Sequence, residues 1–216
     1  TGAMMDTINK GCFITIEGTE GVGKSTNVEF IRQYLADKGI DLRLTREPGG
    51  TPLAEEIREL LLKPREEVVC DDAEILLVFA ARAQHVDQVI KPTLEKGGWV
   101  LSDRFTDATF AYQGAGRGIS WNRIQQLEQY VLGDLRPDLT ILLDIPVEEG
   151  MARVMQRGEP DRFEREKLDF FDKVRQGYHH RLRAEPDRFA LIDASQSLQG
   201  VQQQIAAALA EKLDIF

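Results

Sequence analysis

The residues CFITIEGTEGVGKST, at positions 12–26, contain the motif that decides the fold. The continuous apolar run over 12–16 predicts a buried strand of a parallel sheet, and a helical pattern begins at Lys24. Between them, residues 18–25 match the pattern G-x-x-x-x-G-K-[ST] without a mismatch. Glycines in such a loop let successive backbone N–H groups point at phosphate oxygens, next to the N-terminus of a helix. The stretch therefore predicts a loop that binds the phosphates of a nucleoside triphosphate.

The residues of this phosphate loop have different expected roles. Lys24 can reach the β- and γ-phosphates, and the Ser25 hydroxyl can ligate Mg²⁺. A plain glycine-rich turn is the alternative, but the strand before the match and the helix after it favour the phosphate loop. The residues expected to bind the triphosphate are Gly18, Thr19, Glu20, Gly21, Val22, Gly23, Lys24, Ser25 and Thr26.

Short β-rich runs alternate with longer helical patterns along the chain. Strands are expected at residues 12–16, 41–45, 99–101, 139–143 and 189–192. Helices are expected at residues 24–37, 52–62, 72–95, 121–132, 147–157, 164–184 and 198–213. Such alternation implies right-handed crossovers and a mostly parallel sheet with helices on both faces. We expect a single α/β domain over residues 5–216, with five strands and a short lid at about 150–164.

Composition and charge narrow the class of protein. The 36 Asp and Glu residues exceed the 27 Lys and Arg residues, and the net charge of −9 disfavours a protein that coats nucleic acid. Two cysteines, Cys12 and Cys70, are too few for a disulfide framework or a cysteine metal site. No apolar run approaches the ~20 residues of a membrane span, and residues 1–4 are typical of a cloning remnant before a native start at Met5. We expect a cytoplasmic protein without membrane or nucleic-acid partners.

Two classes of phosphate-loop protein have to be separated. A guanine-specific switch needs [NT]KxD after a strand, but the nearest matches, at 166–169 and 211–214, begin with Glu and fall in helical segments. An enzyme that transfers phosphate to a second substrate needs cations outside the loop, and arginine binds phosphate bidentately. Arg46, Arg82 and Arg104 supply such cations near the edge of a parallel sheet where ligands bind. A hydrolytic switch without an acceptor site is the alternative from another class.

Further motifs occur together along the chain. They are TREPGGT at 45–51, FAARAQ at 79–84, DRF at 103–105, AYQGAGRG at 111–118, RPDLTILLD at 136–144 and RGEPDRFE at 157–164. With the phosphate loop, they make the sequence from 12 to 192 resemble the bacterial thymidylate kinases. The resemblance implies a P-loop kinase fold, transfer of the γ-phosphoryl group of ATP to dTMP with Mg²⁺ to give dTDP and ADP, and a homodimer. Kinases for dUMP, CMP or AMP are the alternatives within this class.

The resemblance implies which side chains hold the acceptor phosphate and the metal ion. In this family the arginine after the second strand and the arginine of the DR motif clamp the phosphate, positions that are Arg46 and Arg104 here. A surface ion pair is the alternative for each. Asp103 ends an apolar strand and is the expected carboxylate on the Mg²⁺ side. Asp144 also ends a strand, but Pro146 follows and opens a helix, so capping or turn chemistry explains it better.

Base and sugar recognition is also implied by the resemblance. Arg82 is expected at the edge of the thymine. Family members often carry a phenylalanine four residues before this arginine, where this chain has Val78, so Phe79 is the favoured stacking partner. Thr109 is expected to hydrogen-bond the pyrimidine, and Tyr112 to pack under the sugar and disfavour a 2′-hydroxyl; ordinary core or helix-surface roles are the alternative. The full expected substrate set is Glu20, Arg46, Phe79, Arg82, Asp103, Arg104, Thr109, Tyr112 and Gln113.

The predicted lid carries arginines that could act in catalysis. Arg153 and Arg157 lie four residues apart and share a helical face ahead of the break at 158–160. A solvated basic face is the alternative. Phosphoryl transfer gains from a cation that arrives on closure, because charge spreads over the equatorial oxygens. The phosphate loop has Glu20 and Val22 rather than an arginine, so the chain resembles family members whose lid supplies it, with Arg157 the first choice and Arg153 on the ATP side.

The remaining ionisable candidates are an acid in the phosphate loop and three histidines. Glu20 resembles the family's loop acid, which reaches the 3′-hydroxyl of the acceptor or a Mg²⁺-bound water. His85, His179 and His180 have no carboxylate or cysteine at a convincing metal-ligand spacing, and a phosphate acceptor is already ionised at neutral pH. We expect structural roles for them, with a binding role as the alternative for His85, which lies on the predicted helix of Arg82. The expected catalytic set is Lys24, Arg104, Arg157 and Arg153.

Overall fold

A computed structural model describes residues 11–156 and 158–214. Five parallel strands form one sheet in the order β2-β3-β1-β4-β5. The strands are β1 (Cys12–Glu17), β2 (Leu42–Arg46), β3 (Trp99–Asp103), β4 (Leu139–Asp144) and β5 (Phe189–Asp193). Parallel neighbours need a crossover between them, and the predicted alternation of strands and helices is confirmed.

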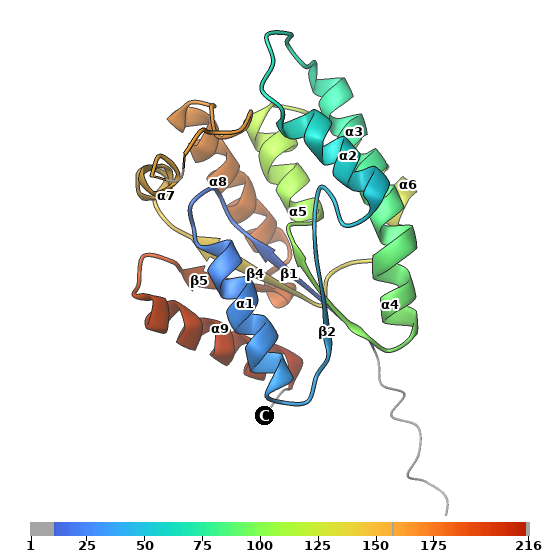
Figure 1. The fold of residues 1–216 in the computed structure, drawn as a ribbon, viewed down its shortest axis with the longest axis vertical. Coiled ribbons are helices and arrows are strands. Elements are labelled where there is room, and N and C mark those ends of the chain that lie inside the picture. The colour runs from blue at the N-terminus through green and yellow to red at the C-terminus, as the bar shows by residue number, and fades with distance from the viewer. Residues whose placement is uncertain (1–10, 157, 215–216) are drawn as a thin grey trace, which may run out of the picture.

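Helices lie on both sides of this sheet (Figure 1). The α-helices are α1 (Lys24–Ala36), α2 (Pro52–Leu62), α3 (Asp71–His85), α4 (Lys91–Glu95), α5 (Thr106–Thr109), α6 (Trp121–Leu132), α7 (Val147–Val154), α8 (Leu168–Ala184) and α9 (Leu198–Leu213). Two π-helical segments, η1 (Val86–Ile90) and η2 (Phe110–Gly116), and a 3₁₀ turn, η3 (Pro186–Arg188), complete the set. Local chemistry defines the start of α2, because the Thr51 hydroxyl accepts a hydrogen bond from the Ala54 amide at 3.2 Å.

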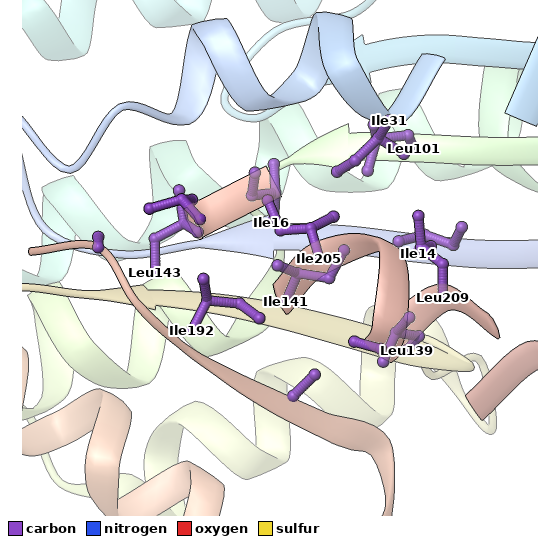
Figure 2. Close-up of a cluster of buried hydrophobic side chains, with 14 of the residues drawn as sticks. Ile14, Ile16, Ile31, Leu101, Leu139, Ile141, Leu143, Ile192, Ile205 and Leu209 are labelled. Atoms are coloured by element: carbon purple, nitrogen blue, oxygen red, sulfur yellow. The ribbon is translucent and has the colours of Figure 1, made fainter. Parts of the chain in front are cut away.

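Strand side chains alternate between two apolar layers. On one face, Ile14, Ile141 and Ile192 pack with α1 and α9, which contribute the fully buried Ile31 and Ile205 (Figure 2). Burying a side chain of this size stabilises the fold by roughly 1.5–3 kcal/mol relative to leaving it in water. This layer holds the helix that follows the phosphate loop against the sheet.

The other face of the sheet packs against different helices. Phe13 and Val100 contact the layer that includes Val86 and Ile90 of η1. Leu142 packs with the aromatic side chains of α8 and η2. The sheet is therefore buried on both faces, which explains why its central strands read as continuous apolar runs.

Three predicted helices differ in extent from the structure. The segment expected at 72–95 is one helical run, but it changes to π-helical geometry over Val86–Ile90. The segment expected at 164–184 becomes helical only at Leu168–Ala184. The segment expected at 147–157 is α-helical over Val147–Val154, and residue 157 lies outside the described part of the chain.

The helical segment over 106–116 was not predicted. Glycine is common in loops, but the glycines of this segment lie in a helix and allow neighbouring side chains to pack closely against its backbone. A Cβ atom on Gly114 would lie 2.7 Å from Nε1 of Trp121, and one on Gly116 would lie 2.6 Å from the Phe170 ring. Glycine is needed there because the neighbouring helices approach the backbone directly, which a single sequence does not reveal.

The parallel register gathers the strand ends at one edge of the sheet. Arg46 lies beside Asp103, and Asp103 lies beside Ile16 of β1. Ligands in open α/β sheets bind outside these carboxyl ends, so the fold places the predicted residues of three strands at one site. Within the described residues, no helix is both long and apolar enough to cross a membrane.

Candidate active site

A cavity of about 360 Å³ opens at the carboxyl edge of the sheet. Its volume falls in the usual range for ligand sites, roughly 300–1,000 Å³. Most of the predicted site residues line it: Glu20, Gly21, Val22, Gly23, Lys24, Ser25, Thr26, Arg46, Arg82, Asp103, Arg104, Thr109, Tyr112 and Gln113. Of the predicted residues that the structure describes, those outside the wall are Gly18, Thr19, Phe79 and Arg153. Arg157 lies outside the described residues.

The phosphate loop presents its lysine to this cavity. Nζ of Lys24 lies 3.4 Å from the carbonyl oxygens of Gly18 and Thr19, which is long for a hydrogen bond. Burial lowers the pKa of Lys24, and the nearby Arg104 charge adds to this, against the carboxylates of Asp103 and Glu20. An ammonium held this loosely is free to bind a phosphate.

Glu20 and Arg104 form the charged centre of the cavity. Arg104 Nη2 donates to Glu20 Oε1 at 2.7 Å, and the Tyr112 hydroxyl donates to the same oxygen at 2.8 Å. Burial alone would raise the pKa of Glu20, but the charges of Arg104 and Lys24 and these hydrogen bonds lower it to about 2. The guanidinium of Arg104 also lies 4.7 Å from the centre of the Tyr112 ring. Glu20 is therefore ionised and fixed in place.

Arg104 is held in an uncommon backbone conformation. Its φ of 70° lies in the left-handed region that few residues other than glycine adopt. Its N–H donates to the Ile16 carbonyl at 3.0 Å, and its own carbonyl accepts from the Ser102 hydroxyl at 2.7 Å. Such strain persists only where the surroundings over-determine the backbone, and it is frequent at functional sites.

Asp103 and Ser25 offer oxygen ligands on the phosphate-loop side. Oδ1 of Asp103 is buried and has no hydrogen-bond partner among the described residues. A buried carboxylate oxygen without a partner is costly unless a ligand or ion completes it. Mg²⁺ is commonly held by one or two carboxylates together with substrate phosphates. No group of three or more His, Cys, Asp or Glu side chains forms a metal cage within the described residues. Asp103 and Ser25 would therefore hold a Mg²⁺ ion only together with phosphate oxygens.

Three arginines from outside the phosphate loop, Arg46, Arg58 and Arg104, line the same cavity. Arg46 pairs with Glu55 at 2.7 Å, and its side chain is half exposed. The surface ion pair that was the alternative role for Arg46 is therefore present. Arg58, which the sequence analysis missed, also lines the cavity, and its Nη1 donates to the Pro48 carbonyl at 2.9 Å. Burial lowers the pKa of Arg58, and the charges of Arg46 and Arg104 add to this. Mutual repulsion of this kind is relieved by an anion bound between the guanidinium groups.

Arg82 is anchored in the wall of the cavity. Its Nε donates to Glu47 at 2.6 Å, its Nη1 to the Thr109 hydroxyl at 3.0 Å and its Nη2 to the Phe105 carbonyl at 3.2 Å. Glu47 also contacts His85 Nδ1 at 2.9 Å. Arg82 is thus rigid and retains N–H groups for a ligand, and His85 has the structural role expected of it.

Phe79 does not reach the cavity, and its predicted stacking role is wrong. Val78 lines the wall, whereas Phe79 is 3% exposed and packs with Ile75 and Phe110. Its ring lies 4.9 Å from the guanidinium carbon of Arg82. Successive residues of a helix point about 100° apart, so only one of the pair 78 and 79 can face the ligand. Phe79 instead packs against the guanidinium of Arg82 without lining the cavity.

Residues after α7 complete the wall of the cavity. Asp161 and Phe163 line it, and the Phe163 ring lies 6.0 Å from the Tyr112 ring. Arg153 is exposed on α7, and its Nη1 lies 3.3 Å from the Gly21 carbonyl of the phosphate loop. A side chain at Gly21 would collide with the backbone of Gly150, so the loop and α7 are in direct contact.

Two further carboxylates, the buried Glu17 and the partly exposed Asp144, have hydrogen-bond partners but do not line the cavity. Glu17, which the sequence analysis missed, accepts from the Phe105 N–H at 2.7 Å and the Tyr178 hydroxyl at 2.8 Å. Burial raises the pKa of Glu17 to about 8, with the nearby charge of Asp107 adding to this. Asp144 makes two bonds to Arg175, at 2.8 and 2.9 Å, so its charge is satisfied outside the cavity.

The other two histidines contact neighbouring side chains. His179 Nε2 lies 3.1 Å from Asp144, and the His180 ring lies 4.4 Å from the ring of Trp121. Both contacts fit the structural roles expected from the sequence. The sequence did not predict roles for the buried carboxylates Glu47 and Glu17. Their hydrogen-bond partners lie 35 or more positions away in the sequence, and no spacing pattern connects residues that far apart.

Comparison with known proteins identifies the family. The family model described as Thymidylate kinase matches residues 16–205. A thymidylate kinase of Hahella chejuensis (strain KCTC 2396) is 60% identical over 206 residues, 95% of this chain and 99% of that relative. One of Pseudomonas putida (strain W619) is 60% identical over 197 residues, 91% of this chain and 95% of that relative.

A solved structure agrees with the sequence relatives. The crystal structure of thymidylate kinase from Ehrlichia chaffeensis superposes with a TM-score of 0.74 at 32% identity and covers 92% of this chain and 98% of that one. The family match, the sequence identity and the shared fold extend over nearly the whole chain. The chain belongs to the thymidylate kinase family.

Proposed function

We propose that this protein transfers the γ-phosphoryl group of ATP to dTMP, giving dTDP and ADP. The observation that supports the proposal is that one cavity is lined both by a phosphate loop and by three arginines from outside that loop, Arg46, Arg58 and Arg104. A hydrolytic switch has no use for a second anion site. A phosphotransferase needs one, because donor and acceptor phosphates must meet in one desolvated space.

The transfer relies on charge and position rather than on a tuned base. Lys24 stabilises negative charge on the phosphoryl group, and Arg104 holds the acceptor phosphate against it. Glu20 keeps Arg104 in that position through the 2.7 Å ion pair. Ser25 and Asp103 would hold Mg²⁺, which when bound would neutralise charge on the phosphate oxygens.

Base selection follows from the hydrogen-bond donors of Arg82, Thr109 and Gln113. We call this part of the cavity wall the base end. The free N–H groups of Arg82 fit the carbonyl of a thymine edge and would face the amino group of a cytosine unfavourably. Thr109 and Gln113 line the same region, and Tyr112 lies between the base end and Glu20. Uracil differs from thymine by one methyl group, and such a difference is worth only about 1–3 kcal/mol. We therefore expect stronger rejection of CMP and AMP than of dUMP.

We further propose that the lid supplies the catalytic arginine. Val22 and Glu20 stand in the phosphate loop where an arginine would otherwise serve. Arg153 already contacts that loop from α7, and Arg157 lies four residues further along the chain. This placement supports Arg157 as the transition-state cation and Arg153 as a contact on the ATP side.

A homodimer is the proposed assembly. Leu76 on α3 is 58% exposed, and it shares a groove with Ile119 and with Leu127 of α6. An exposed apolar patch of this kind favours association. Sedimentation measurements at several protein concentrations test it.

The experiment that tests the proposed function measures ADP formation from ATP and Mg²⁺ with a panel of nucleoside monophosphates. We expect turnover with dTMP, weaker turnover with dUMP and little with CMP or AMP. ATP hydrolysis at a comparable rate without any acceptor would favour the switch, and turnover with CMP or AMP instead of dTMP would favour a different kinase.

A further inference from the structure

A buried carboxylate on α3, Glu74, connects η2 to the segment 158–167, and residues of both line the cavity. Glu74 is 1% exposed and accepts three side-chain donors. Gln113 Nε2 lies 2.9 Å from Oε1, Arg117 Nε lies 3.2 Å from the same oxygen, and Arg162 Nη2 lies 2.8 Å from Oε2. The donors come from η2, from the residue after it and from the segment 158–167, which precedes α8. A buried charge with this many partners loses much stability when one of them is removed.

The charges around Glu74 balance. Arg117 donates to Glu74 and also to Glu166 at 2.5 Å, while Arg162 pairs with Glu74. Two guanidinium groups therefore face two carboxylates. The segment 158–167 contributes one charge of each sign to this cluster, Arg162 and Glu166. When the segment leaves, Arg117 and Gln113 remain on Glu74, so the buried carboxylate keeps partners and the charge balance holds.

Arg162 also ties this segment to the end of α2. Its backbone N–H donates to the Leu62 carbonyl at 3.0 Å, and its Nε donates to the Leu61 carbonyl at 2.6 Å. The last carbonyls of a helix have no partner within the helix, so these bonds complete α2. The residues on either side, Asp161 and Phe163, line the cavity. The position of Arg162 thus sets the position of part of the cavity wall.

We propose that Glu74 is a positioning residue that couples closure of the segment 158–167 to occupancy of the base end of the acceptor site. Glu74 fixes the Gln113 amide on the cavity wall and, through Arg162, fixes the segment across it. A monophosphate bound between them orders both groups, and the ordered segment in turn strengthens binding of the monophosphate. This inference rests on the proposed function, because it takes the base end as the place where dTMP binds.

The helix α7, which precedes the segment 158–167 in the sequence, contacts the phosphate loop. Arg153 on α7 reaches the Gly21 carbonyl, and α7 ends at Val154, eight positions before Arg162 in the sequence. Acceptor binding at Glu74 and donor binding at the phosphate loop therefore act on one stretch of chain. Two ligands that order the same element favour each other's binding.

The test uses Arg162→Ala, Glu74→Gln, the double variant and a matched control. Arg165→Ala is that control, because Arg165 is exposed in the same segment and its side-chain Nε donates to the Pro160 carbonyl within that segment. Hydrogen exchange of the amides in 158–167 is measured without substrate, and the dissociation constant of dTMP is measured by calorimetry without ATP. Thermal unfolding confirms that each variant is folded.

We expect Arg162→Ala to speed exchange in 158–167 and to weaken dTMP binding by about 10- to 100-fold, the usual worth of a hydrogen bond to a buried charge. Arg165→Ala should change the affinity less than about threefold. The double variant should lose clearly less affinity than the product of the two single losses, since both remove one contact. If Glu74→Gln fails to fold, the comparison of Arg162→Ala with Arg165→Ala decides alone.

Two results would overturn the inference. One is equal exchange and equal dTMP affinity in Arg162→Ala and Arg165→Ala. The other is a double variant whose loss in affinity equals the product of the single losses. Neither result touches the proposed function, which fails separately if the unaltered protein does not phosphorylate dTMP.

Discussion

The carboxylate of Glu20 lies 2.7 Å from the guanidinium of Arg104, and this ion pair joins the phosphate loop to the acceptor side of the cavity. Both groups are charged at neutral pH, since the pKa of Glu20 is lowered to about 2. An acceptor phosphate bound to Arg104, as proposed, would therefore share this guanidinium with Glu20. The arrangement keeps the guanidinium oriented before the substrate arrives, which is the kind of preorganisation that lowers a transition-state barrier.

Replacing Arg104 should affect the two substrates unequally. Arg104→Ala removes the acceptor clamp and should raise the KM for dTMP by about 100-fold, while the KM for ATP changes less than about threefold. Arg43→Ala is the control, because Arg43 is an exposed arginine on the edge strand β2. Steady-state kinetics with each substrate varied in turn make the comparison, and equal losses for dTMP and ATP would contradict the assignment.

Arg58 provides a second test of the acceptor site. Its guanidinium lines the cavity beside Arg46 and Arg104, and its hydrogen bond goes to a backbone carbonyl. Arg58→Ala should raise the KM for dTMP by about tenfold, the worth of one charged hydrogen bond. Arg65→Ala, an exposed arginine beyond the end of α2, should leave it unchanged. An unchanged KM in Arg58→Ala would place the acceptor phosphate elsewhere.

Variants of Val78 and Phe79 test which of these two neighbouring residues contacts the ligand. Phe79→Leu should lower the free energy of unfolding by about 1 kcal/mol, because it loosens the packing around Arg82. Val78→Ala should also lower the free energy of unfolding by about 1 kcal/mol, because Val78 is buried against Ile57 and Leu61 of α2. Only Val78→Ala should raise the KM for dTMP several-fold, whereas Phe79→Leu should leave this KM nearly unchanged. Urea denaturation and initial-rate kinetics on both variants test this. The reverse pattern would restore Phe79 as the stacking residue.

The sequence predicted the phosphate loop, the order of strands and helices, and most of the cavity wall. These features follow from local patterns: an apolar run, a glycine spacing, an arginine after a strand. It did not predict Glu74 or Glu47, since their partners Arg162 and Arg82 lie 88 and 35 positions away. Phe79 was misassigned for a related reason. A helix pattern shows which residues are apolar, but neighbouring positions such as 78 and 79 differ only in which wall they face.

Glu17 should make the stability of the protein depend on pH. Asp107, Tyr178 and Arg104 face this buried carboxyl, and its pKa is raised to about 8, with burial the largest cause. Because the folded pKa lies above the unfolded one, the stabilisation is complete below about pH 4.5 and is lost as the pH rises towards 8. The stability of the unaltered protein relative to Glu17→Gln should fall between pH 5.5 and 7.5, by at most about 1.4 kcal/mol per pH unit. Urea unfolding of both proteins measures it, and parallel pH profiles would refute it.

Arg157 is expected to act mainly in the transition state. Arg157→Ala should lower kcat and kcat/KM by similar factors, about 10²- to 10³-fold, as for other preorganised donors. Arg153→Ala should be milder, because Arg153 contacts the phosphate loop from the ATP side. Lysine at position 157 should rescue only part of the loss, since it lacks the guanidinium fork. If Arg157→Ala keeps its kcat and raises only KM, this residue serves docking and the catalytic cation lies elsewhere.

The most direct test of the central claim compares dTMP with thymidine as the acceptor, with ATP and Mg²⁺ held constant. Both molecules present the same base and sugar, so they differ only at the phosphate that Arg46, Arg58 and Arg104 are proposed to hold. The account predicts that dTMP yields dTDP and ADP in equal amounts, whereas thymidine yields no phosphorylated product and does not raise ADP formation above the level without acceptor. Equal ADP formation with dTMP, with thymidine and with no acceptor would contradict it.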